Sequence, residues 1–134
     1  MTQEFDRKTP EGADKYFAYC ISNGDVAGAM GCYDPEAVYI GRDGQPVAGL
    51  ANIEKSMQKL CSMSPTLSGT THHATVVGNL LIWLDTWTLT GKGPDGTPLS
   101  MKGGSACLMR RGKDGTWRWL VNSPFAAPFF KNVI

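Results

Sequence analysis

The residue of this sequence that most invites a chemical role is Asp85, which lies between Trp83 and Trp87 in the apolar segment 80–90. Alternate side chains of a β-strand share a face, so the acid and both indoles are predicted to point the same way. A carboxylate on such a surface is costly unless it is paired or protonated. It therefore indicates either a structural ion pair or a ligand pocket with a carboxylate of perturbed pKa. The candidate partners for an ion pair are Arg110, Arg111 and Arg118.

Asn122 and the pair His72-His73 are further polar candidates for such a pocket. Asn122 could donate a hydrogen bond to an oxygen on which negative charge develops, or it could bind the backbone at the turn that follows it. The two histidines are adjacent on a strand and are predicted to face opposite ways, with His73 pointing inward as a polar group or proton carrier. They cannot share a metal from opposite faces, and no acid lies at ligand spacing, so no metal site is predicted.

The composition limits the classes of function. The 134 residues fit one domain, 1–134, and 13 Lys and Arg balance 12 Asp and Glu without a basic tract. This balance argues against nucleic acid and anionic membranes as partners. No apolar run approaches the roughly 18 residues of a membrane span, and the polar N-terminus is unlike a secretory signal, so a cytoplasmic location is expected. The four scattered cysteines are predicted to be free thiols, and no cofactor motif is recognised.

The first half of the chain is predicted to be helical. Thr9-Pro10-Glu11 is typical of a helix start, and a 3.6-residue period follows as far as Asn23-Gly24. Asp25 is expected to begin a short helix that ends near Tyr33. A strand at 37–40 and a third helix after Gly49 complete this half.

The second half is predicted to be an antiparallel meander, because short turns rich in glycine separate its apolar segments. The expected strands are 70–77, 80–90, 98–111 and 116–122. Gly103-Gly104 indicates a bulge or sharp bend, and the apolar tail 124–134 is expected to pack across the sheet or on a partner. Helices followed by a curved sheet predict an α+β fold with a concave interior suited to a small molecule.

Three stretches, 16–30, 33–53 and 109–124, resemble in order and spacing the nuclear transport factor 2-like superfamily, which includes ketosteroid isomerase and the SnoaL-like cyclases. The resemblance implies a cone-shaped, cystatin-like fold in which a curved sheet wraps around N-terminal helices. Many members of the superfamily are dimers whose sheets pack face to face. A homodimer through the sheet would account for the apolar second face of 80–90, which the tail could cover instead.

The resemblance does not extend to the isomerase chemistry. The isomerases use a tyrosine and a protonated aspartate as an oxyanion hole and a second aspartate as the proton shuttle. The corresponding positions fall on Phe17, Cys107 and Gly41. None of these residues can replace the polar group it stands for, so the resemblance supports the pocket and argues against that mechanism.

The candidate catalytic residues are therefore Asp85 and Asn122. The side chains expected to contact a ligand are Tyr16, Phe17, Tyr39, His73, Trp83, Trp87, Cys107 and Leu120. The tyrosines could equally anchor a helix to the sheet. Three functions follow as hypotheses: a cofactor-independent isomerase, cyclase, dehydratase or hydrolase acting on a small apolar carbonyl compound; a ligand carrier without chemistry; and a dimeric association module with a filled pocket.

Overall fold

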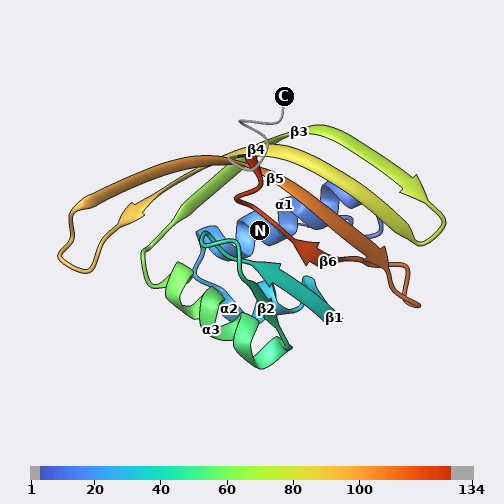
Figure 1. Cartoon of the computed structure of the whole chain (residues 1–134), viewed down its shortest axis with the longest axis horizontal. Helices are drawn as coiled ribbons and strands as arrows, with labels where there is room; N and C mark the ends of the chain where they lie inside the picture. The colour runs from blue at the N-terminus through green and yellow to red at the C-terminus, as the bar shows by residue number, and fades with distance from the viewer. Residues whose placement is uncertain (1–3, 128–134) are drawn as a thin grey trace.

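The computed structural model describes residues 4–127 (Figure 1). The helices are α1 (Pro10–Ser22), α2 (Val26–Met30) and α3 (Leu50–Cys61). The strands are β1 (Tyr33–Ile40), β2 (Pro46–Ala48), β3 (Thr66–Val77), β4 (Leu80–Lys92), β5 (Pro98–Arg111) and β6 (Trp117–Asn122). The short strand β2 was not predicted, and α2 ends before Tyr33 because that residue already belongs to β1.

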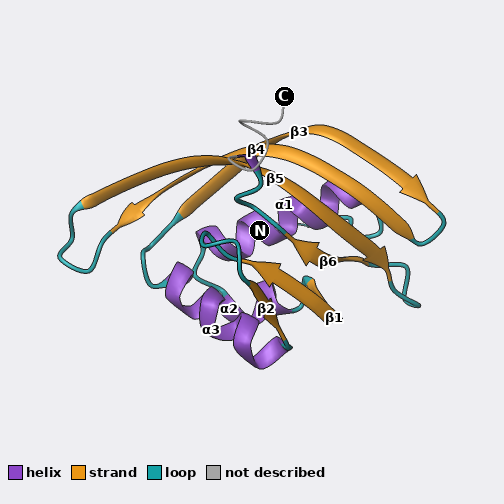
Figure 2. Cartoon of the chain, in the orientation of Figure 1, coloured by secondary structure: helices purple, strands orange, loops and turns teal. Residues whose placement is uncertain are grey.

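The six strands form one sheet in the order β2-β1-β6-β5-β4-β3. Neighbouring strands are antiparallel except for β1 and β6, which run parallel. The predicted α+β fold is confirmed, but the sheet is mixed rather than wholly antiparallel. Figure 2 shows the long strands β3, β4 and β5 arching over the helices, with α1 beneath the arch.

The helix ends follow the predicted local chemistry. The Thr9 side chain accepts a hydrogen bond from the backbone N–H of Gly12 at 3.1 Å, and Pro10 occupies the first turn of α1. Asp25 caps α2 by accepting from the N–H of Gly28 at 2.9 Å. These caps fix where the two helices begin.

Of the three register shifts in the sheet, two change which way predicted site residues point. One lies in β3 between Thr71 and His73, and the other lies where β5 pairs with β6. At each shift one strand carries an extra residue, so the alternation of faces reverses beyond it.

No shift occurs at Gly103-Gly104, where a bulge or bend was predicted, since Gly103 pairs with Trp87 in continuous register. A Cβ at Gly103 would come within 2.5 Å of the Trp87 ring. Gly103 is therefore required because the indole lies against its backbone, and the prediction of a bulge was wrong.

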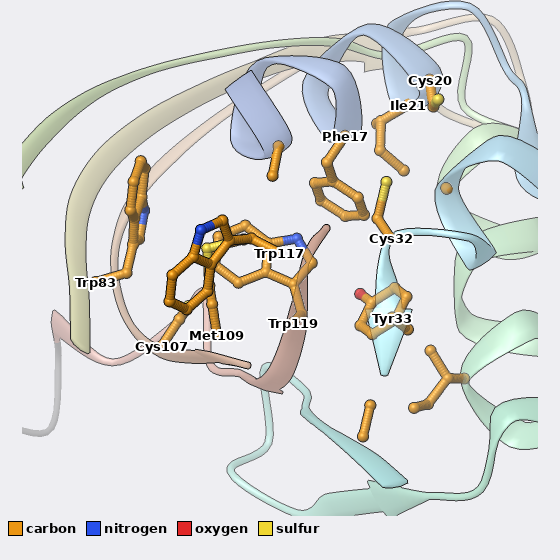
Figure 3. Close-up of a cluster of buried hydrophobic side chains, with 14 of the residues drawn as sticks. Phe17, Cys20, Ile21, Cys32, Tyr33, Trp83, Cys107, Met109, Trp117 and Trp119 are labelled. Atoms are coloured by element: carbon orange, nitrogen blue, oxygen red, sulfur yellow. The ribbon is translucent and has the colours of Figure 1, made fainter. Parts of the chain in front are cut away.

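The core between helices and sheet is aromatic (Figure 3). Phe17 of α1 lies edge-on to Tyr33 and Trp119, with ring centroids 5.8 Å and 6.0 Å apart. Trp83 is fully buried and contacts Trp119 in the same manner at 6.0 Å. This cluster fixes α1 against the middle of the sheet. All four cysteines are free, as predicted.

Residues 4–127 contain no helix that is long and apolar enough to cross a membrane. For the expected tail at 124–134, only 124–127 lie within the described residues. There, Ala126 is buried and its N–H donates to the carbonyl of Gly104 at 2.9 Å.

A two-pronged ion pair joins β1 to β5. Arg110 donates from Nε to Asp34 Oδ2 at 2.9 Å and from a terminal nitrogen to Oδ1 at 2.6 Å. The Asp34 carboxylate is buried, so it depends on this partner for compensation of its charge.

Replacement of Arg110 by alanine would leave Asp34 buried without its guanidinium. We expect Arg110→Ala to lower the free energy of unfolding measured by urea denaturation, because the buried Asp34 carboxylate loses its partner. The control is Arg42→Ala in the exposed β1–β2 turn, which should change it by less than about 0.5 kcal/mol. Equal losses in the two variants would contradict a stabilising role for the pair.

Candidate functional site

A cavity of about 100 Å³ lies between α1, α3 and the concave face of the sheet. Since one water needs about 10–15 Å³, this space accommodates several waters or a small organic molecule. Its walls are mostly apolar and aromatic, and the polar groups that reach it are few.

Asp85 lies on the concave face of β4 and lines this cavity, as predicted. Its neighbours along that face, Trp83 and Trp87, are buried, whereas Leu84 and Thr86 on the other face are exposed. One carboxylate oxygen, Oδ2, accepts a hydrogen bond from Trp83 Nε1 at 2.8 Å. The other, Oδ1, is buried and has no hydrogen-bond partner among the described residues.

The alternative of a structural ion pair for Asp85 does not hold. Arg110 is bound to Asp34, and the guanidinium of Arg111 donates to Asn79 Oδ1 at 2.9 Å and 3.1 Å. Arg118 donates to the carboxylate of Asp114 and to the carbonyl of Gly31. All three candidate arginines thus have other partners, and the Asp85 charge lies in the cavity without a guanidinium.

A second carboxylate, Asp14 of α1, lines the same cavity and was not predicted from the sequence. Burial, and then the negative charge of Asp85, raise the pKa of Asp14 from 3.8 to about 7, although the neighbouring Lys15 opposes the rise. A signal was present, because Asp14 lies three and four residues before Phe17 and Ala18, which also line the cavity. A charged residue on the inward face of an amphipathic helix is a sequence signal of a polar group in the interior.

The two acids give the cavity the elements of acid–base chemistry. A group with a pKa near neutrality is present in both protonation states, so it can donate or accept a proton. Among residues 4–127, no group of three or more His, Cys, Asp or Glu side chains is arranged to hold a metal ion.

Asn122 lines the cavity from the end of β6 and is held by side chains. Its Nδ2 donates to the Tyr33 hydroxyl at 2.9 Å, and its Oδ1 accepts from the Cys107 thiol at 3.4 Å. Burial raises the pKa of Cys107 to about 12, so this donor stays a thiol. Asn122 is therefore held by side chains and not by the backbone of the turn at Ser123-Pro124, which was the alternative. The second hydrogen of its amide has no role in this network and is available to a ligand.

The predicted wall residues Phe17, Tyr39, Trp87 and Cys107 line the cavity. The Trp87 ring is fixed, since its Nε1 donates to the carbonyl of Pro124 at 2.7 Å. Phe125 packs edge-on against it, with centroids 5.5 Å apart, and also lines the cavity. The start of the tail thus forms part of the cavity wall.

Two residues that were predicted to contact a ligand, Trp83 and Tyr16, do not line the cavity. Trp83 is fully buried in the core and is not part of the wall, although it holds Asp85. Tyr16 is displaced by about 100° around α1 from Phe17 and points away from the cavity. Its ring lies under the Arg7 guanidinium, 4.6 Å from the centroid, and packs against Phe5.

Two further predictions failed at the register shifts. His72 is the extra residue in β3, so both histidines lie on the convex face. His72 forms a hydrogen bond with the Thr86 hydroxyl at 2.8 Å. His73 pairs with Leu84, which is exposed on that face. His73 also bonds the Thr75 hydroxyl at 2.6 Å, and it does not line the cavity.

Leu120 is the extra residue in β6, where Trp119 pairs with Met109 and Val121 with Leu108. Beyond it the alternation reverses, so Trp119 and Asn122 both line the cavity while Leu120 does not. Simple alternation along the predicted strand placed Trp119 on the opposite face, so it was missed as a wall residue.

Comparison with known proteins agrees with this architecture. The model of the SnoaL-like domain matches residues 13–119. The chain belongs to the SnoaL-like family. No match was found among curated protein sequences.

Solved structures share the fold at low sequence identity. A ketosteroid isomerase-like protein from Erwinia carotovora superposes with a TM-score of 0.73 at 11% identity, covering 84% of this chain and 88% of that one. A provisionally assigned dehydratase of the NTF2-like family from Streptomyces avermitilis gives 0.69 at 16%, covering 86% and 93%. A provisionally assigned calcium/calmodulin-dependent protein kinase II association domain from Xanthomonas campestris gives 0.74 at 15%, covering 88% and 85%. At these identities the likeness establishes the NTF2-like fold.

The raised pKa of Asp14 makes a prediction about stability. The folded state holds this proton up to about pH 7, whereas the unfolded chain releases it near the ordinary aspartate pKa of 3.8. Stability therefore falls as pH rises between these values and stays low above them. From pH 4 to pH 8, urea denaturation should show the wild type losing roughly 3–4 kcal/mol more than Asp14→Asn. Parallel pH profiles for the two proteins would contradict the raised pKa.

Proposed function

We propose that this SnoaL-like protein catalyses a proton transfer on a small, largely apolar carbonyl compound without a cofactor. The observation that carries the proposal is the presence of Asp14 and Asp85 in one cavity, with the pKa of Asp14 at about 7. Isomerisation, cyclisation and dehydration all require a proton to be removed beside a carbonyl and returned elsewhere, which a pair of acids can do.

The proposed roles follow from the hydrogen bonds of each group. Asp85 acts as the base, because Trp83 orients its carboxylate and leaves Oδ1 without a donor. Asp85 takes the proton from the carbon next to the carbonyl, and the electrons of that bond move onto the carbonyl oxygen. The free N–H of Asn122 stabilises this oxygen, and protonated Asp14 returns a proton to the product.

A ligand carrier without chemistry is the second candidate. The isomerase positions are occupied by Phe17, Cys107 and Gly41, so the groups that relatives of this fold would use are absent. The carrier would use the same cavity, and only a measurement of turnover separates the two. The filled-pocket hypothesis is disfavoured, because the buried Trp83 and Trp117 leave the cavity open.

The proposed reaction can be tested without knowledge of the natural substrate. In deuterated water, the wild type should catalyse deuterium exchange beside the carbonyl of small cyclic ketones, followed by NMR. Asp85→Asn, which keeps the shape of the side chain, should reduce this rate by roughly 10²–10⁴-fold. Glu54→Gln on the exposed face of α3 is the matched control and should leave it unchanged.

Unchanged exchange in a folded Asp85→Asn protein would contradict the role of this residue. Ketones that stabilise the wild type against heat but show no exchange with it would favour the carrier instead.

We also propose that the protein is a homodimer through the convex face of the sheet. Val77, Leu80, Ile82 and Leu84 are 71%, 45%, 51% and 40% exposed and form a continuous apolar patch on β3 and β4. A patch of this kind is typical of an interaction surface. The similar Xanthomonas structure is named as an association domain, which is in keeping with assembly.

The dimer can be tested by light scattering after gel filtration. Ile82→Glu places a charge in the centre of the patch and should convert a dimer to a monomer, because an unpaired buried charge is strongly unfavourable. Ser100→Glu, near the far end of the same face, should leave the mass unchanged. A wild type that runs as a monomer at micromolar concentration would contradict the proposal.

A further inference from the structure

The charges around the cavity are unbalanced. Two carboxylates, Asp14 and Asp85, line it, and no lysine, arginine or histidine is among the described residues of its wall. Charges interact strongly across a site of low dielectric constant. A carboxylate or phosphate group would be repelled here, so the cavity selects for neutral or positively charged ligands.

A proton on Asp14 reduces the negative charge of the cavity by one. The charged groups that act on Asp14 of α1 are Asp85 of β4 and the neighbouring Lys15 of α1. The thiols of Cys32 and Cys107 also lie near Asp14, but burial raises the pKa of each to about 12, so they stay neutral. A cation in the cavity would stabilise both carboxylates in their ionised form and would displace this proton.

Two features of the wall suit an organic cation. The rings of Phe17, Trp87 and Trp119 line the cavity, and the face of an aromatic ring attracts ammonium groups. Asp85 Oδ1 is buried without a donor among the described residues, and an ammonium N–H would supply one. Trp119 is 3% exposed, and its Nε1 has no partner within residues 4–127. As a donor, this N–H could bind an acceptor atom elsewhere on the same ligand.

We propose that the cavity binds a small protonated amine, with its ammonium group between Asp14 and Asp85 and its apolar part against the aromatic rings. This ligand class rests on the proposed function, since it assumes that the cavity is the functional site. With this ligand, ionised Asp14 would hold the ammonium group, and Asp85 would both take the proton and return it. The volume of about 100 Å³ limits the ligand to a single ring or a short chain beside the ammonium.

Calorimetry with three probes of equal size tests the proposal: 2-phenylethylammonium, the neutral 2-phenylethanol and the anionic phenylacetate. At pH 8 the ammonium should bind at least about tenfold more tightly than the alcohol, and phenylacetate should not bind. This preference should fall below about threefold in Asp14→Asn and in Asp85→Asn. The control Glu54→Gln should keep it in full.

Proton release provides a second readout. At pH 6, the ammonium should release protons as it binds, because Asp14 must ionise, whereas the alcohol should release none. Titrations in buffers of different ionisation enthalpy measure this number directly. The release should disappear in Asp14→Asn.

Failure of the ammonium to bind, equal binding of the alcohol, or a preference that survives both substitutions would overturn the proposal. These results are independent of the exchange reaction. Ketone exchange that depends on Asp85 without ammonium binding would remove only the ligand class. Ammonium binding without exchange would remove only the proposed reaction.

Discussion

The constraint on which the site depends is the burial of two carboxylates in one cavity that has no cation among the described residues of its wall. Asp85 lies in the middle of an apolar strand face, and Asp14 faces the same space from helix α1. Burial makes the ionised form of Asp14 unfavourable, and the negative charge of Asp85 adds to this effect. The protein accommodates the arrangement by keeping a proton on Asp14 up to about pH 7. Groups arranged at such a cost to stability are typical of functional sites.

The surrounding structure serves to hold this pair in place. Trp83 anchors one oxygen of Asp85 from within the aromatic core, and Phe17 fixes the helix that carries Asp14. Gly103 leaves room for the ring of Trp87, whose N–H ties the start of the tail to the cavity wall. The aromatic residues thus provide both the rigidity of the site and an apolar lining around its charges.

Alternation and local capping were enough to predict the helices, the meander and the shared face of Asp85 and its two tryptophans. The resemblance to the superfamily indicated that this face points inward. They failed where a single extra residue reverses the alternation. His72 in β3 and Leu120 in β6 are such residues, and the errors on His73, Leu120 and Trp119 all follow from them. The register of a bulge depends on pairing between strands, which one strand's own pattern does not contain. Asp14 was missed for another reason. Its place on the same helix face as Phe17 can be read from the sequence, but only the folded structure shows that Asp85 lies across the cavity from it.

The coupling of the two acids can be observed directly by following the carbon-13 chemical shift of the Asp14 carboxyl group with pH. The structure predicts a midpoint at about 7 in the wild type and a clearly lower one in Asp85→Asn, where the neighbouring negative charge is gone. A midpoint near the ordinary value of 3.8 in the wild type would show that the two carboxylates do not share a dry cavity. That result would contradict the account of this site.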